Sequence, residues 1–205
     1  MILYDHVLSA DCYKLRLMFD LLGTAYERRP VDMHPGRAHQ RPGFRTLSPF
    51  GRLPVLQDGS RTLWDAQAGL VYIAESCDAS ASWTARSAEE HANIQTWLQV
   101  AGGPLRTVTA ARARNLFGDV GDMSSEDGLL EAITILDDRI VEQELRGSSW
   151  LVSDRPTIAD VAVFPDIALH EDAGISLDGF SGLRRWLGAF RKLPGFAPMP
   201  GIASM

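Results

Sequence analysis

The chain has 205 residues, of which 45% are hydrophobic, and it carries a formal net charge of −6. A chain of this size can bury a complete hydrophobic core and is long enough for two small domains at most. Residues 1–78 hold equal numbers of basic and acidic side chains, so the excess acid lies in the second half, and an acidic chain without basic tracts argues against nucleic acid as a partner.

The first third of the chain alternates strand and helix patterns. Residues 2–4 predict a strand, and residues 9–14 predict a loop that enters a helix. Apolar residues recur there at three- and four-residue steps, as expected of a face packed on a sheet: Cys12, Leu15, Met18, Phe19 and Leu22. Gly23 predicts the end of this helix. Residues 26–31 predict a second strand, and residues 33–47 predict an irregular segment of the kind that often borders a site.

A hairpin led by a proline follows. Residues 55–57 and 61–64 are short apolar runs joined by Asp58-Gly59, a dipeptide that suits a tight reversal. Pro54 cannot donate a ladder hydrogen bond, so it marks a strand start, an edge or a cis turn. A cis Leu53–Pro54 bond, which the family resemblance described below leads us to predict although local preference favours trans, would turn the Leu53 backbone outward to pair with an extended peptide. A plain edge proline is the alternative.

The rest of the chain has only helical patterns. A short helix is predicted from about residue 65, and the small, polar residues 78–87 are typical of an interdomain linker. Helical spacing resumes at about residue 87, with a kink or break predicted at Gly102-Gly103-Pro104. Residues 115–125 predict a loop, and residues 129–145 predict a third helix.

The final stretch contains a clear helix start. Thr157 is predicted to be an N-cap, with Asp160 reaching back to its backbone amide, and residues 179–191 predict a last helix. This capping pair is a folding element, and we assign it no catalytic role.

Several kinds of site and location are not expected. Cys12 and Cys77 have no paired spacing, which argues against a disulfide framework or a structural zinc site. The five histidines form no short metal-ligand motif. The chain has neither a basic, apolar leader nor 18 consecutive uncharged apolar residues. We therefore expect a soluble cytoplasmic protein with no metal and no membrane contact.

The order strand, loop, helix, strand and proline-led hairpin resembles the thioredoxin-like domain of the cytosolic glutathione transferases. Ser9, Cys12 and residues 14–16 look like the serine-bearing loop and first helix of theta-, delta- and bacterial-type members. Residues 47–56 look like the family's asparagine-proline-x-glycine-x-valine-proline-x-leucine run, with Ser48 in place of asparagine.

The resemblance extends through the helical half to about residue 193. Asp65-Ala66 falls where the family usually has glutamate-serine, and residues 155–160 are similar to its buried capping box. The fold implied is an α/β thioredoxin-like domain over residues 1–78, which binds glutathione, and an all-α domain over residues 87–205, which forms the electrophile pocket. The function implied is conjugation of the glutathione thiolate to a small hydrophobic electrophile.

The resemblance assigns glutathione, the co-substrate, to particular residues. The Leu53 backbone, beside Pro54, would pair with the cysteinyl unit. Asp65 would accept from the γ-glutamyl amine, while the Ala66 amide would donate to the neighbouring carboxylate. Arg52 would meet the glycyl carboxylate, unless it is a solvated surface arginine.

Three further residues complete the predicted site. His39 and Gln40 are weaker candidates for the glycyl carboxylate. Arg16, with Arg52, offers positive charge near the site.

Relatives are typically homodimers, so the resemblance implies a homodimer, and the apolar loop residue Phe50 is a candidate interface residue.

The chemistry is predicted to centre on Ser9. It precedes a helix N-terminus, where free amides and the helix dipole favour an anion, and its hydroxyl would donate to the glutathione thiolate. Alternatively, Ser9 only caps the helix. Cys12 is expected to pack inward as a buried thiol, although it could instead be a redox thiol.

Three residues depart from the family's pattern. The negative charge of Asp11 would oppose a thiolate at Ser9 unless it caps the helix or turns away. Ala66 lacks the family's serine hydroxyl, and Ser48 replaces asparagine. Two alternative functions therefore stay open: glutathione-dependent thiol-disulfide exchange or peroxide reduction, and a non-catalytic binding module with this fold.

Overall fold

The computed structural model describes residues 1–118 and 128–202. Its N-terminal part contains a four-stranded sheet in the order β2-β1-β3-β4. The strands are β1 (Ile2–Asp5), β2 (Glu27–Pro30), β3 (Val55–Asp58) and β4 (Arg61–Leu63). β1 and β2 are parallel, whereas β1 pairs with β3, and β3 with β4, in antiparallel fashion.

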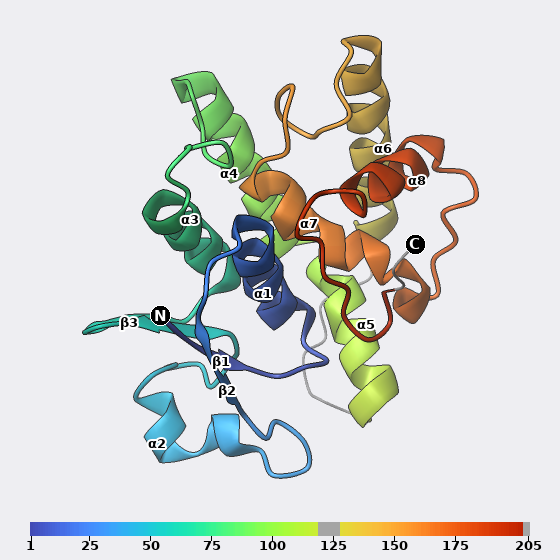
Figure 1. Ribbon diagram of the computed structural model, residues 1–205. Coiled ribbons are helices and arrows are strands. Elements are labelled where there is room, and N and C mark those ends of the chain that lie inside the picture. Colours follow the sequence, from blue (N-terminus) through green and yellow to red (C-terminus); the bar gives the residue numbers. More distant parts are fainter. Residues whose placement is uncertain (119–127, 203–205) are drawn as a thin grey trace.

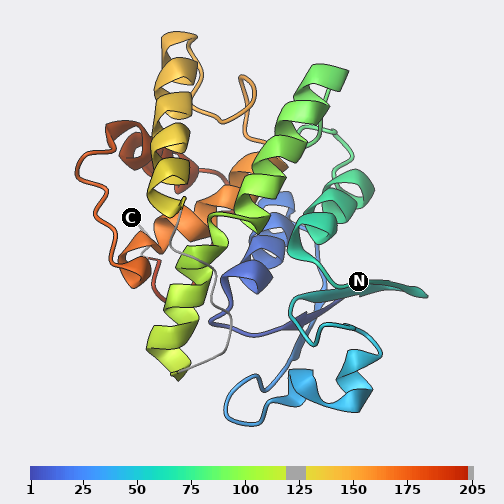
Figure 2. The ribbon, with the colours of Figure 1, turned by 180° about the vertical axis from the view of Figure 1, so that it is seen from behind.

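Helices cover both faces of this sheet (Figures 1 and 2). α1 (Ala10–Leu22) and α3 (Ala66–Cys77) pack together on one face, and the short elements η1 (Ala38–Gln40) and α2 (Pro42–Arg45) lie on the other. Gly23 ends α1 in the left-handed conformation, and its N–H donates to the carbonyls of Phe19 and Asp20. The predicted helix end is therefore confirmed.

In the described residues of the C-terminal part, all regular secondary structure is helical. It contains α4 (Ala88–Gly102), α5 (Arg106–Phe117), α6 (Leu129–Leu145), α7 (Ile158–Ala168), η2 (His170–Ala173) and α8 (Ser181–Phe190). α7 is at its centre and packs on α1, α4 and α8 (Figure 1). The predicted fold class, a thioredoxin-like domain plus an all-α domain, is confirmed.

Two predicted boundaries can be compared with the structure. The break at residues 102–104 is confirmed, because α4 ends at Gly102 and α5 begins at Arg106. The loop predicted over residues 115–125 starts too early, because α5 continues through Phe117. Nothing in the sequence from Asn115 to Phe117 breaks a helix, whereas Gly118 has a positive φ. Residues 119–125 lie outside the described part of the chain.

α1 is buried on more sides than its apolar pattern predicts. Lys14 and Arg16 are both buried, and α7 packs against α1 and pairs with it through Asp166 and Lys14. Arg16 pairs with Asp5 and donates to the carbonyl of Val7 at 3.0 Å. Arg16 therefore supports the β1–α1 loop and does not line the cleft described below.

The capping pair predicted at the start of α7 is confirmed. The Thr157 N–H donates to the Asp160 carboxylate at 2.9 Å, and the Thr157 hydroxyl accepts from the Ala159 N–H at 3.3 Å. The other Asp160 oxygen accepts from the Trp186 indole at 3.1 Å, which joins α7 to α8. Burial raises the pKa of Asp160 to about 6, although these donors oppose the shift.

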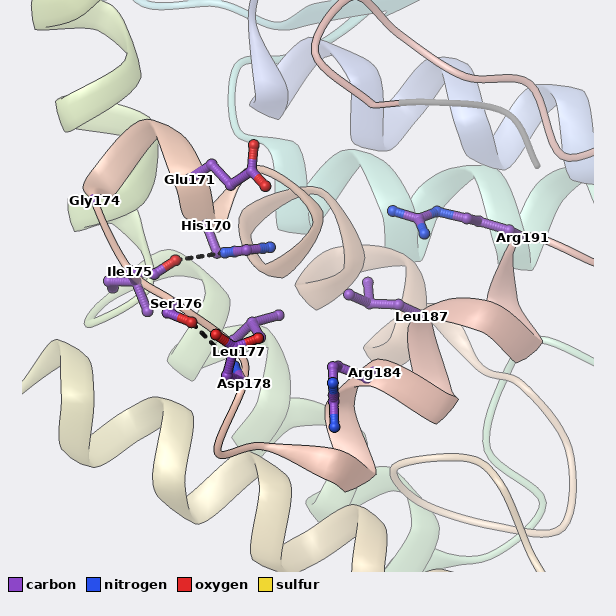
Figure 3. A pocket seen from close by; sticks show the side chains of 10 residues that line it. All are labelled: His170, Glu171, Gly174, Ile175, Ser176, Leu177, Asp178, Arg184, Leu187 and Arg191. Carbon is purple, nitrogen blue, oxygen red and sulfur yellow. Dashed lines mark hydrogen bonds between the residues drawn. The ribbon is translucent and has the colours of Figure 1, made fainter.

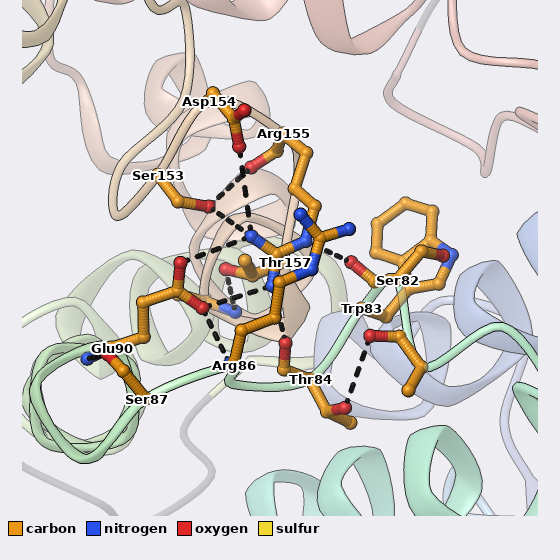
Figure 4. A network of polar contacts seen from close by, with 12 residues as sticks. Ser82, Trp83, Thr84, Arg86, Ser87, Glu90, Ser153, Asp154, Arg155 and Thr157 are labelled. Atoms are coloured by element: carbon orange, nitrogen blue, oxygen red, sulfur yellow. Dashed lines mark hydrogen bonds and ion pairs between the residues drawn. The ribbon is translucent and has the colours of Figure 1, made fainter.

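Arg155 ties the segment between α3 and α4 to the helical half (Figure 4). Its guanidinium donates to the Ser82 carbonyl at 2.9 Å and to the Thr84 carbonyl at 2.7 Å, and pairs with Glu90 at 3.0 Å. This network joins the segment between α3 and α4 to α4 and to the loop before α7, at a place outside the cleft.

Candidate functional site

A cleft of about 390 Å³ lies between the N-terminal part and α5. Its N-terminal wall includes Ser9, His39, Arg52 and Leu53. A smaller cavity of about 240 Å³ shares Arg52 and Leu53 with the cleft and adds two predicted residues, Asp65 and Ala66. The structure thus brings the predicted site residues together around two adjoining hollows, except Pro54, which lines neither.

Ser9 both caps α1 and faces the cleft. Its hydroxyl oxygen accepts from the Cys12 N–H at 3.2 Å, which shows that Ser9 is the N-cap of α1. A hydroxyl group has one donor and two acceptor positions. Capping therefore leaves the Ser9 O–H able to donate to an anion in the cleft, and the two predicted roles are compatible.

Cys12 is buried, as predicted. Its side chain is 0% exposed and packs with Val31 and Leu53. Burial, with a further contribution from Asp5, raises the pKa of the Cys12 thiol to about 12. A thiol in this environment remains protonated near neutral pH, which disfavours redox reactivity.

Asp11 lies at the junction of the two hollows and lines both. Burial alone would raise its pKa, but the Lys14 ammonium and then Arg106 lower it below the ordinary value. The Lys14 Nζ lies 3.0 Å from the Asp11 carboxylate. Asp11 is therefore an anion held in an ion pair, and its charge toward the cleft is partly neutralised.

Lys14 continues this ion pair into the helical half. It is 0% exposed, and its Nζ lies 2.9 Å from an Asp166 oxygen, while the other Asp166 oxygen accepts from the Thr109 hydroxyl at 2.8 Å. Burial raises the pKa of Asp166 to about 6, although Lys14 opposes the shift. Sequence analysis missed this cluster, whose only local signals are single charges within apolar stretches.

The Leu53–Pro54 bond is cis, as predicted, and so is His34–Pro35, which was not predicted. Leu53 is buried yet lines both hollows, and within the described residues its backbone N–H and C=O make no hydrogen bond. Ser48, also buried, accepts from the Arg52 N–H at 3.0 Å. The hydroxyl at position 48 thus supports the turn that presents Leu53.

Asp65 and Ala66 form the start of α3. One Asp65 oxygen caps the helix by accepting from the Ala68 N–H at 2.9 Å. Ala66 is the first helical residue and is buried, so its N–H is one of the amides that have no partner within the helix. This helix start offers an anion-binding amide beside a carboxylate.

His39 and Gln40 also line the cleft. Burial, and then the charge of Arg37, lowers the pKa of His39, which makes it a neutral hydrogen-bonding group near pH 7. The Gln40 amide donates to the Gly51 carbonyl at 3.0 Å. A Cβ at Gly51, where φ is +59°, would lie 2.8 Å from the His39 carbonyl, so this close approach requires glycine.

α5 forms the wall that faces Ser9. It contributes Arg106, Thr109, Arg112, Ala113, Leu116 and Phe117. The Phe117 ring stacks on His34 with ring centroids 5.2 Å apart, and meets His6 edge-on at 5.7 Å. The C-terminal end of α5 is therefore an apolar and aromatic surface. No residue of this wall was predicted, because the sequence does not show that α5 lies across the cleft, and Leu116 and Phe117 fell within the predicted loop.

A larger open hollow, of about 740 Å³, lies between α8 and the loop after η2 (Figure 3). It is lined by charged and apolar side chains that include Arg184, Leu187 and Asp178, and by none of the predicted site residues. The described residues contain no cluster of three or more potential metal-binding side chains. No helix among them has both the length and the hydrophobicity needed to cross a bilayer.

The fold is a thioredoxin-like domain followed by an all-α domain, and α5 of the all-α domain lines one wall of the cleft. Residues 1–75 match the model of the glutathione S-transferase N-terminal domain, and residues 139–194 match that of the C-terminal domain. Together these matches span more than half of the chain. The chain belongs to the glutathione transferase family.

Individual relatives agree with this assignment. The chain is 29% identical over 166 residues to glutathione S-transferase 3 of Zea mays, which covers 77% of this chain and 72% of the relative. A possible glutathione S-transferase from Rhodopseudomonas palustris has a similar structure, with a TM-score of 0.80, 24% identity and coverage of 97% of this chain and 96% of that one.

A glutathione transferase homologue from Lodderomyces elongisporus, solved with two glutathione molecules per subunit, has a TM-score of 0.79. It is 20% identical and covers 95% of this chain and 94% of its own. The predicted family and enzyme class are confirmed, whereas the serine-type subclass and the roles of single residues remain predictions.

Proposed function

We propose that this protein is a serine-type glutathione transferase that joins the glutathione sulfur to a small hydrophobic electrophile. Residues 1–78 bind glutathione, and residues 87–205 complete the electrophile pocket. The observation that carries the proposal is the cleft itself, in which Ser9 and the unpaired backbone of Leu53 face the apolar end of α5. Attack of the thiolate forms a carbon–sulfur bond, and the leaving group departs with the electron pair of the broken bond.

Glutathione fits the two hollows as an extended peptide. Its cysteinyl backbone pairs with the N–H and C=O of Leu53, and its γ-glutamyl amine reaches the Asp65 oxygen that is not used in capping. The Ala66 N–H donates to the adjacent carboxylate. The glycyl carboxylate lies toward Arg52, with His39 and Gln40 at the same end of the cleft.

The Ser9 hydroxyl stabilises the thiolate by donating to it. If the thiol pKa falls from about 8.5 to about 6.5, the thiolate fraction at pH 7 rises from roughly 3% to roughly 75%. Because the thiolate is then less basic, its intrinsic nucleophilicity falls about six- to tenfold. The net gain is only about two- to fourfold, so the greater part of the acceleration comes from holding the electrophile against the sulfur.

Two other functions remain as alternatives. Thiol-disulfide exchange or peroxide reduction would need a reactive Cys12, and its burial and raised pKa count against this function. A non-catalytic module is favoured by Asp11, whose negative charge beside Ser9 would oppose a thiolate. The ion pair between Asp11 and Lys14 partly neutralises that charge, so it counts less against catalysis.

The surface beside the site favours a homodimer. Phe50 is 63% exposed and meets Trp64, which is 43% exposed, edge-on with ring centroids 5.5 Å apart. An exposed aromatic pair of this kind is typical of a protein interface. We therefore retain the homodimer, with Phe50 in its interface, as part of the proposal, together with a cytoplasmic location and a role in detoxification.

Two assays test the proposal. The protein is first passed over immobilised glutathione, and turnover is then measured with a chloroaryl electrophile and with a mixed disulfide of glutathione. We expect retention, conjugation of the chloroaryl compound, and the same conjugation rate in a Cys12→Ala control. Disulfide reduction that is lost in Cys12→Ala would establish the redox alternative, and failure to bind glutathione would establish the non-catalytic one.

A further inference from the structure

The smaller cavity lies between the two halves of the molecule. Gln67, from α3, and Gly102, from the end of α4, both line it. A Cβ at Gly102 would be 3.5 Å from the Gln67 amide, so the two halves are in close contact there. A ligand at the start of α3 is therefore within reach of side chains from the helical half.

Arg106 is the cation that the helical half contributes to this cavity. It is the first residue of α5, is half-buried, and lines both hollows. Its side chain makes no hydrogen bond or ion pair with any residue in the ranges 1–118 and 128–202. Arg112, further along α5, is instead engaged by Asp172 and by the Pro200 carbonyl at 2.7 Å. The N–H donors of Arg106, whose charge also acts on Asp11, are therefore available to a ligand, whereas those of Arg112 are engaged.

The charges around the smaller cavity match a zwitterion. Two carboxylates, Asp11 and Asp65, and two guanidinium groups, Arg52 and Arg106, line it. The γ-glutamyl end of glutathione carries one ammonium and one carboxylate on the same carbon atom. A site for such a head group needs anionic and cationic partners together, and this cavity provides both.

We propose that Arg106 binds the α-carboxylate of the γ-glutamyl group, together with the Ala66 N–H, so that this end of glutathione bridges the two domains. The inference rests on the proposed function. A guanidinium group suits this task because its planar set of N–H donors matches a carboxylate. Arg106 thereby supplies the carboxylate contact that Ala66, which lacks a hydroxyl, cannot make with its side chain.

The test compares glutathione with γ-aminobutyryl-cysteinylglycine, which differs only in lacking that α-carboxylate. Binding of both peptides is measured by calorimetry for the wild type, Arg106→Gln and Arg106→Lys. Arg114→Gln is the matched control, because it makes the same change on the same helix at a position that lines neither hollow. Circular dichroism confirms that each variant is folded.

We expect Arg106→Gln to weaken glutathione binding by about ten- to a hundredfold, the range for a lost hydrogen bond to a charged group. Its affinity for the shortened peptide should change by less than about threefold, and Arg106→Lys should lie between the wild type and Arg106→Gln. Arg114→Gln should match the wild type with both peptides.

Three outcomes would overturn the inference. Equal weakening of both peptides would show that Arg106 does not contact the carboxylate. Unchanged glutathione affinity with a raised KM for the electrophile would place Arg106 in the second-substrate site. Unchanged glutathione affinity together with an unchanged KM for the electrophile would show that Arg106 contacts neither substrate. Failure of the wild type to bind glutathione would instead reject the proposed function, so the two failures are distinguishable.

Discussion

Two serines in this protein make the same structural contact in different places, and comparing them separates capping from catalysis. Ser9 caps α1 by accepting from the Cys12 N–H, and Ser87 caps α4 by accepting from the Glu90 N–H at 3.1 Å. Only Ser9 lines the cleft. Replacing either serine by alanine should lower the free energy of unfolding by about 1 kcal/mol, the usual cost of losing an N-cap.

The effect on the reaction should differ between the two variants. In Ser9→Ala the thiol pKa should return from about 6.5 to about 8.5, which reduces the thiolate fraction at pH 7 about 25-fold. The thiolate in the variant is more basic and therefore about six- to tenfold more nucleophilic, which offsets part of this loss. Turnover should therefore fall about two- to fourfold at pH 7, with a smaller change in glutathione affinity, and this fall should disappear at about pH 7.5 to 8 and reverse at higher pH. Ser87→Ala should retain the wild-type profile.

The measurement is kcat and KM with a chloroaryl electrophile between pH 6 and pH 9.5, alongside urea unfolding of both variants. The reasoning is refuted if Ser9→Ala matches the wild type at pH 7, since Ser9 would then only cap α1. It is equally refuted if Ser9→Ala and Ser87→Ala lose the same turnover, since the loss would then reflect helix stability.

Three other predictions follow from individual residues. Ala66→Ser should tighten glutathione binding about three- to thirtyfold with an unchanged fold, because the new hydroxyl adds a hydrogen bond to a charged carboxylate in place of bridging water; calorimetry showing no gain would mean that the carboxylate is not at this helix end. Cys12 should not react with a thiol reagent in folded Cys77→Ser protein and should react once the chain is unfolded in guanidinium; rapid labelling of the folded protein would favour the redox alternative. Burial raises the pKa of Asp166 to about 6 in the folded protein, against an unfolded value near 3.9, so the folded state binds more protons between these pH values. The protonated Asp166 therefore stabilises the fold fully below about pH 4, and this contribution is lost as the pH rises through 6. Urea unfolding should show the wild type losing about 1 to 3 kcal/mol relative to Asp166→Asn between pH 4 and pH 6.5, and parallel profiles would show that this carboxyl is not perturbed.

Features with a local cause could be predicted from the sequence. Thr157 and Asp160 form a capping pair because their three-residue spacing alone places the two side chains at one helix start. Gly23 ends α1 because glycine accepts a positive φ at low cost. The residues around Leu53 were predictable through their likeness to a family pattern, since local preference by itself favours a trans proline.

Features that depend on packing between the two halves could not be predicted. Lys14 lies two residues from an arginine and among apolar residues, and nothing nearby in the sequence shows that its partner is Asp166 on α7. Arg106 follows a break between helices and looks like an ordinary surface residue until α5 is placed across the cleft. Arg16, expected to offer positive charge near the site, does not line the cleft, because it pairs with Asp5, and that pairing depends on how β1 lies against α1.

A crystal structure with glutathione bound would test the central claim most directly. The account predicts that the glutathione sulfur lies within about 3.5 Å of the Ser9 hydroxyl oxygen, with the cysteinyl backbone paired to Leu53 and the γ-glutamyl group at the start of α3. A sulfur bonded to Cys12, or a glutathione molecule bound outside the cleft, would contradict it.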